Sequence, residues 1–183
     1  PVSFKQSLEV ALQQGHYVIV RVGGATSAAE PPPERSVVVR ATGPLADVRL
    51  QDVAPQVGLD FRQGAFRFGV SNDVTAMMGG GVCWLDYDND GWLDLFVVNS
   101  FSNGDRSRWQ KEGGLPRSAL YHNVKGSFVN VSKQSGADLA VQGEGCVAAD
   151  FNGDGYTDLL VTTAAYDKLL WNNGDGTFTE GAK

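Results

Sequence analysis

Two short stretches of the sequence concentrate oxygen-bearing side chains at a regular spacing. One reads Asp-Tyr-Asp-Asn-Asp-Gly-Trp-Leu-Asp from Asp86 to Asp94, and the other reads Asp-Phe-Asn-Gly-Asp-Gly-Tyr-Thr-Asp from Asp150 to Asp158. Alternate oxygen donors on a tight loop suit a hard cation such as calcium, which takes about six to eight oxygens. The pattern therefore predicts a calcium ion in each loop. The expected ligands are the side chains of Asp86, Asp88, Asp90, Asp94, Asp150, Asn152, Asp154 and Asp158, and the main-chain carbonyls of Trp92 and Tyr156.

The two loops close differently from a helix–loop–helix calcium motif. That motif needs a bidentate Glu at position 12, whereas position 12 here is Val97 in one loop and Val161 in the other. We expect Asp94 and Asp158 to close the loops as bidentate ligands. Magnesium fits less well because it gives up its waters reluctantly. The alternative, a pair of acidic turns without metal, would leave several carboxylates repelling one another.

The acidity of the chain belongs to these loops. The 183 residues carry a formal net charge of -6, and removing the charges of the seven aspartates in the loops would leave +1. An acidic chain of this kind does not favour nucleic-acid binding, which needs basic surfaces. No run of about 18 apolar residues is present, so no membrane-spanning helix is expected.

The loops lie within an internal repeat. The segment from Leu50 to Leu59 resembles 128–137, 81–95 resembles 145–159, and 120–128 resembles 170–178. The spacing between the copies falls from 78 to 64 to 50 residues, so the first copy contains two insertions of 14 residues each. The second insertion contains basic residues and a tryptophan: Arg106, Arg108, Trp109, Lys111 and Arg117.

Each copy also contains four short apolar or β-branched runs, which predict four strands. Repeated four-stranded units of this size are typical of propeller blades. We expect an all-β fold of two such blades, an incomplete propeller, after a small α/β segment. The predicted strands are 81–85, 95–99, 119–122 and 127–131 in the first blade, and 146–149, 159–163, 168–171 and 177–180 in the second.

The sequence from Gly79 to Leu95, followed by Leu-Tyr-His-Asn at 120–123, resembles the FG-GAP/VCBS repeat and is similar to the CRTAC/ASPIC-UnbV group. The resemblance covers residues 48–181. It implies an integrin-α-type β-propeller with structural calcium, and an extracellular or periplasmic protein whose blades contact proteins or glycans. Propellers of this type resemble seven-bladed rings, and two blades leave open edges. We therefore expect a fragment of a longer protein, or partner chains that cover those edges.

Residues 1–47 do not match the repeat. They predict a helix over 3–14 and strands over 17–22 and 36–40, with a proline-rich loop between the strands. The expected domains are thus 1–47 and 48–183, with blades over about 79–132 and 143–181. Cys83 and Cys146 make no disulfide framework; one bridge or two buried thiols are both open.

Catalytic groups are sparse. The two histidines, His16 and His122, show no catalytic spacing, and His122 aligns with Asn172 as a turn residue. We expect a non-catalytic, calcium-binding interaction or structural subunit of a larger assembly, with the periphery of a membrane complex as one option. The alternative is a fragment of a calcium-dependent lyase or hydrolase, or a glycan-binding adhesin. We expect the basic insertion to contact a partner, although a solvated loop would also explain it.

Overall fold

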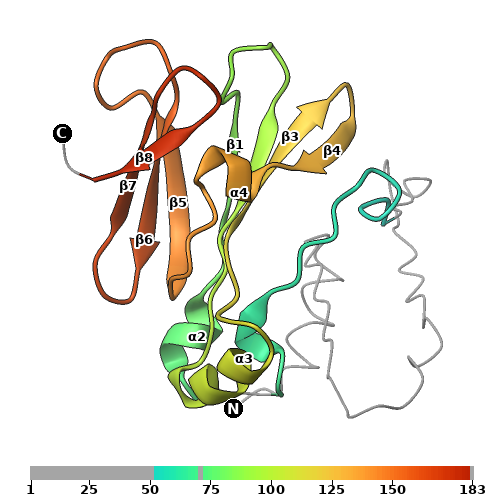
Figure 1. The fold of residues 1–183 in the computed structure, drawn as a ribbon, viewed down its shortest axis with the longest axis vertical. Coiled ribbons are helices and arrows are strands. Elements are labelled where there is room, and N and C mark those ends of the chain that lie inside the picture. The colour runs from blue at the N-terminus through green and yellow to red at the C-terminus, as the bar shows by residue number, and fades with distance from the viewer. Residues whose placement is uncertain (1–51, 70–71, 182–183) are drawn as a thin grey trace, which may run out of the picture. The chain divides into compact units, whose positions relative to one another are not determined.

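The computed structural model divides the chain into two compact units, residues 1–51 and 52–183, and describes residues 52–69 and 72–181. The helix and the two strands that we predicted in the N-terminal segment lie outside the described residues. In the described part, no helix is long and apolar enough to cross a membrane. The second unit is built mainly from strands (Figure 1).

The first blade is a four-stranded antiparallel sheet in sequential order. Its strands are β1 (Val82–Leu85), β2 (Asp94–Val97), β3 (Ala119–Val124) and β4 (Ser127–Asn130). Side chains of β1 alternate between exposed and buried, whereas most of β2 is buried, as expected for a strand with a neighbour on each side in the sheet.

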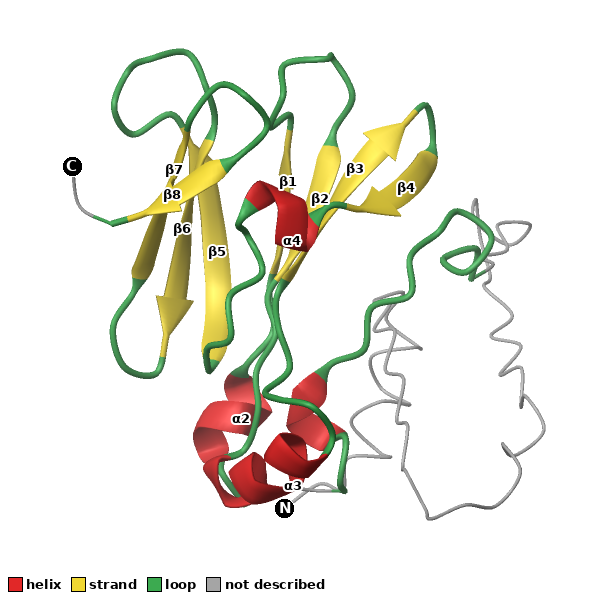
Figure 2. Ribbon diagram, in the orientation of Figure 1, coloured by secondary structure: helices red, strands yellow, loops and turns green. Residues whose placement is uncertain are grey.

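The second blade repeats this topology. Its strands are β5 (Gly143–Ala149), β6 (Asp158–Thr163), β7 (Lys168–Asn172) and β8 (Phe178–Glu180). Figure 2 shows the two sheets side by side, with short helices between and below them. The predicted all-β class and the eight predicted strands are confirmed, with ends that coincide or differ by at most three residues.

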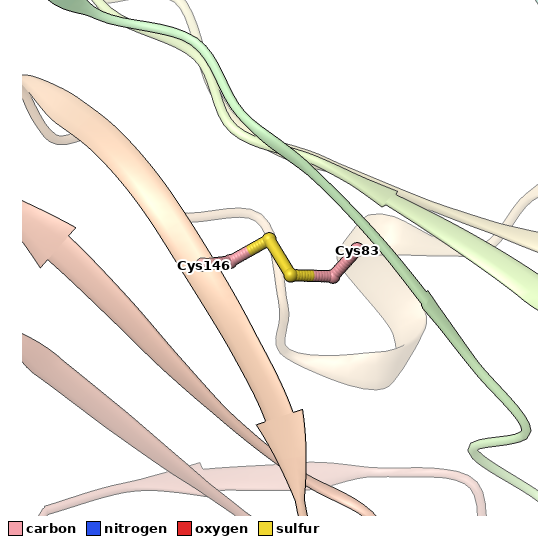
Figure 3. The surroundings of a disulfide bond; sticks show 2 residues. All are labelled: Cys83 and Cys146. Carbon is pink, nitrogen blue, oxygen red and sulfur yellow. A yellow bond between two sulfur atoms is a disulfide. The ribbon is translucent and has the colours of Figure 1, made fainter.

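The main hydrophobic core lies between the sheets. Phe96 and Leu120 from the first blade, and Leu159 and Leu170 from the second, are fully buried in it. A disulfide between Cys83 on β1 and Cys146 on β5 joins the innermost strands covalently (Figure 3). The bridge that the sequence left open is therefore present, and it makes the two blades one covalent unit.

Glycine permits the close approach of β1 and β5. A Cβ atom on Gly81 would lie 2.8 Å from the Cα atom of Gly145, closer than real Cβ contacts come. Because neither residue has a side chain, the backbones of the two blades meet at the start of their inner strands.

A turn precedes each blade and packs on its outer strand. In the turn after β4, Ala137 N donates to Ser132 O (3.0 Å), and Gly136 lies against Phe178 of β8. In the segment before the first blade, Leu59 N donates to Ala54 O (2.8 Å), and Gly58 lies against Phe128 of β4. Both glycines have positive φ. The two segments that match in the sequence, 50–59 and 128–137, therefore adopt the same turn over the part that the structure describes, which begins at residue 52. The turn after β4 contains the short helix α4 (Ser132–Ser135).

The two insertions of the first copy fold as short helices at one end of the first blade (Figure 1). The first provides the 3-10 helix η1 (Gly64–Phe66) and α2 (Val74–Met78), and the second provides η2 (Asn103–Asp105) and α3 (Arg106–Lys111). The ring of Trp109 packs edge-on against Phe68, 5.0 Å between centroids. The alternative of a solvated loop does not describe the second insertion, because its aromatic packing on the first insertion accompanies an ordered helix.

Candidate metal centre

Both acidic loops connect the first and second strands of their blades. The loop from Asp86 to Asp94 joins β1 to β2, and the loop from Asp150 to Asp158 joins β5 to β6. They project from the same end of the unit, opposite the helices α2 and α3 (Figure 1). The loops touch, because Asn89 Nδ2 donates to Gly155 O (3.3 Å). Asn89 has positive φ, a conformation that Asn tolerates better than most residues.

The backbone of the first loop wraps around its own carboxylates. Asp86 accepts hydrogen bonds from the N–H groups of Asp90 (3.1 Å) and Gly91 (3.0 Å). Asp90 accepts one from Trp92 N (2.8 Å). Asp86, Asp88 and Asp94 each place a carboxylate oxygen within 4.8 Å of the others. Three hard oxygen donors therefore converge at this loop.

The closing residue of the first loop is a fully buried carboxylate. Asp94 accepts hydrogen bonds from Tyr87 N (3.1 Å) and Asn123 N (2.7 Å). Burial raises the pKa of Asp94, and the N–H groups of Asn123 and Tyr87 oppose that shift. A buried carboxylate needs such compensation, because charge without partners is costly in the interior. These hydrogen bonds hold Asp94 at the base of the loop.

The second loop has the same framework. Asp150 accepts hydrogen bonds from the N–H groups of Gly153, Asp154 and Gly155, at 2.7, 3.2 and 2.9 Å. These bonds, that from Gly155 above all, lower the pKa of Asp150. The buried Asp158 closes the loop and accepts from Phe151 N (3.0 Å).

The third position distinguishes the loops. It is Asp88 in the first loop and Asn152 in the second, where Asn152 Nδ2 donates to Asp154 Oδ2 (2.8 Å). The amide replaces one negative charge but keeps a carbonyl oxygen as a potential ligand. The first loop is therefore the more negative of the two.

An asparagine on the third strand braces each loop, and the sequence did not identify it as part of the site. Asn123 donates through its backbone N–H to Asp94 (2.7 Å) and through its side chain to Leu93 O (2.8 Å). Asn172 donates in the same way to Asp158 (2.8 Å) and Thr157 O (3.0 Å). These equivalent contacts hold the end of each loop to the β-hairpin that follows.

The asparagines also correct the predicted alignment. Asn123 pairs with Phe128, and Asn172 with Phe178, across the last two strands of their sheets. Asn172 therefore corresponds to Asn123 and not, as we predicted, to His122, whose counterpart is Trp171. The physical reason is the turn length: the hairpin of the second blade contains one residue more, 173–177 against 124–127.

His122 lies at the first loop, although the sequence favoured a turn role for it. Its Nδ1 atom is 3.1 Å from Asp94 Oδ1 and 3.4 Å from Asp88 Oδ2. The ring packs edge-on against Tyr87, 5.8 Å between centroids. His122 thus contacts two of the predicted metal ligands, and only the strand register would have revealed this. His16 lies outside the described residues.

The donor set fits calcium. Carboxylate oxygens converge in the first loop, buried aspartates close both loops, and the backbone is already wrapped around Asp86 and Asp150. The N–H groups of Trp92 and Tyr156 donate to Asp90 (2.8 Å) and Asp154 (3.0 Å), which fixes the peptide groups between positions 6 and 7 of each loop. Ligation by the carbonyls of Trp92 and Tyr156 stays a prediction.

The basic residues of the insertion make contacts within the chain. The guanidinium groups of Arg106 and Arg108 lie over the rings of Phe101 (4.8 Å) and Phe68 (5.6 Å). Arg117 forms a salt bridge with Asp138 (3.2 Å). The side chain of Lys111 is exposed. We predicted from the sequence that these residues contact a partner, and that contact stays a prediction. Within the chain, Arg106 and Arg108 pack on aromatic rings and Arg117 pairs with an aspartate.

The comparisons with known proteins agree with this geometry. No curated protein matches the chain. The profile of the FG-GAP-like repeat matches twice, at residues 86–161 and 150–183. Each match begins at the first carboxylate of a loop, so the repeat that the profile describes is the unit of loop and strands seen here. The two matches together span more than half of the sequence, and the chain belongs to the FG-GAP-like repeat family.

Proposed function

We propose that the chain is a calcium-binding, propeller-type repeat module that works as a non-catalytic interaction or structural subunit of a larger extracytoplasmic assembly. The observation that carries this proposal is the duplicated loop, in which a buried aspartate, Asp94 or Asp158, closes a backbone wrapped around a more accessible aspartate, Asp86 or Asp150. FG-GAP-like repeats often bind calcium, which is consistent with these donors.

Calcium would supply a compact double positive charge that offsets the repulsion among the loop carboxylates. The protein's own residues hold the ligands in position. The N–H groups of the loop orient Asp86 and Asp150, and Asn123 and Asn172 hold the closing aspartates. Because each loop connects two adjacent strands of a sheet, a loop held in one conformation stabilises the blade that contains it. Calcium is therefore proposed as a structural ion.

A catalytic role is less well supported. The hollow beside the first loop has a volume of about 430 Å³ and is lined by Tyr87, Asp88, Gln134 and residues 174–177. Burial raises the pKa of Tyr87 to about 12, so its hydroxyl stays protonated at neutral pH and is a poor general base. The alternative of a calcium-dependent lyase or hydrolase would have to take its base from the carboxylates of Asp88 and Asp175 in this hollow, and Asp88 is already a proposed calcium ligand. A glycan-binding adhesin remains compatible with the same loops.

An extracytoplasmic location is supported by the bond between Cys83 and Cys146, because disulfides persist in oxidising compartments. The family is typically extracellular as well. Partner chains are proposed to cover the faces of the blades that remain open, and the exposed basic side chains of α3 are a second candidate contact.

Calcium titration of the full chain tests this function. Isothermal titration should give two bound ions, and chelation with EDTA should lower the melting temperature. Ligand at 100 times its dissociation constant stabilises by about 2.7 kcal/mol per site. Asp86→Asn and Asp150→Asn should each abolish one site, and Glu144→Gln, on β5 at the end away from the loops, should abolish neither. No binding heat and no melting shift would refute the proposal.

A further inference from the structure

The two blades meet through different faces. Cys83 corresponds to Val147 in the repeat, and Cys146 corresponds to Val82, because the inner strands match at a spacing of 64 residues. The interface therefore joins the Cys83 face of the first blade to the opposite face of the second. Among the described residues, head-to-tail contact of this kind leaves one complementary face on each blade without a neighbouring blade.

The open face of the second blade carries apolar residues whose counterparts are buried. Val147 is 50% exposed, whereas Cys83 at the same position of the first blade is 8% exposed. Phe151 is 44% exposed, whereas its counterpart Tyr87 is 6% exposed and stacks on Phe178 of the neighbouring blade. The difference arises because the first blade has a neighbour on this face.

The open face of the first blade shows the same contrast. Val82 and Trp84 on β1 are 62% and 54% exposed. Leu59 and Phe61, which lie on this face beside Leu95 and Tyr121, are only half-buried. Their counterparts in the repeat, at 137 and 139, are buried in the core between the blades.

We propose that the second blade of one molecule docks on the first blade of another copy, in the arrangement in which the two blades pack within the chain. This inference rests on the proposed role as a blade module and identifies its partner. The two open faces are the two halves of the interface that the chain already contains, so a second copy presents the shape and apolar chemistry that each face lacks.

The repeat also gives the register of the contact. Within the chain, Cys83 faces Cys146. Between copies, the residues at the same positions are Val147 of one molecule and Val82 of the next. Because the contact is heterologous, the copies add in one direction and either close into a ring or continue as a filament.

Cysteine pairing tests this register. Full-length chains with Val82→Cys and with Val147→Cys, carrying different tags, are mixed and oxidised. We expect a covalent pair between the two variants, with peptide mapping that joins positions 82 and 147, and little self-pairing of either variant. Both positions are exposed, so the variants should fold, and their melting curves check this.

The outcomes separate the alternatives. Pairing of Val82→Cys with itself would indicate a symmetric dimer and would overturn the proposal. So would absence of the mixed pair in folded variants, or a wild-type chain that sediments as a monomer up to high concentration.

A charge substitution gives a second measurement. Trp84→Lys should weaken self-association by about tenfold or more, since it removes a large aromatic from the centre of the face. Tyr166→Lys is the matched control, because Tyr166 is exposed but lies in the connection between β6 and β7. Calcium titration of both variants should be unchanged. Normal calcium binding by a wild-type chain that does not self-associate would refute this inference while leaving the proposed function intact.

Discussion

The side-chain amide of Asn172 in the second blade donates a hydrogen bond of 2.7 Å to the main-chain carbonyl of Tyr87 in the first loop. The same amide braces the second loop through Thr157 O (3.0 Å). The side chain of Asn123, its counterpart in the first blade, forms hydrogen bonds within its own loop and hairpin, with Leu93 O and Gly126 N. One buried asparagine therefore links the two acidic loops to each other.

Asn172→Ala should lower the free energy of unfolding by about 1–3 kcal/mol, because it leaves buried carbonyl groups without a donor. It should also weaken calcium binding at both loops. Asn123→Ala, the matched variant, should cost less and affect only the first loop. Denaturant unfolding and calcium titration measure both effects, and equal behaviour of the two variants would contradict the proposed link.

Reduction of the bond between Cys83 and Cys146 should destabilise the unit by about 2–4 kcal/mol, because the bond closes a loop between residues 63 apart. The double variant Cys83→Ser/Cys146→Ser should melt at a lower temperature than the oxidised wild type. A reducing agent should shift the wild type but leave the double variant unchanged. An unshifted wild type would show that the blades hold together without the bond.

Gly81→Ala should destabilise by about 1–3 kcal/mol, since its Cβ atom would meet the Cα atom of Gly145 at 2.8 Å and force the blades apart. Gly104→Ala is the control, because a Cβ there would lie at an ordinary distance of 3.6 Å from Ser102 Oγ. Thermal melting compares the two. A neutral Gly81→Ala would mean that the interface tolerates a wider spacing than the structure has.

Trp109→Ala should loosen the packing of the two insertions, because the ring contacts Phe68. We expect a loss of about 1–3 kcal/mol with both calcium sites retained, since α3 lies at the other end of the blade from the loops. Lys111→Ala, on the same helix but exposed, should leave stability unchanged. A loss of calcium binding in Trp109→Ala would show that the two ends of the blade are coupled.

The sequence predicted the parts of the fold that rest on local patterns. The spacing of oxygen donors from Asp86 to Asp94 located a loop, and apolar runs such as 95–98 located the buried strands on either side. The repeat then supplied the second copy of each. These features depend on residues that lie close together in the chain, so they can be predicted from a single sequence.

The missed features depend on register and tertiary contact. His122 faces Asp88 and Asp94 only because β3 pairs with β2 in a particular register, and a hairpin longer by one residue hid the match of Asn123 with Asn172. The bond between Cys83 and Cys146 depends on which faces of the blades meet. The helices at 103–111 are short and depend on contact with Phe68, so periodicity alone could not reveal them.

The bond between Cys83 and Cys146 also decides how the unit carries mechanical load. A pulling force along the chain enters β1 and passes through the sulfur atoms directly into β5. The residues between the two cysteines, including the first acidic loop and α3, then bear no tension. Reduction would allow the chain between the two cysteines to extend under load by roughly 200 Å, given the 63-residue separation. In an extracytoplasmic tether, the first loop would keep its shape under strain for as long as the cysteines stay oxidised.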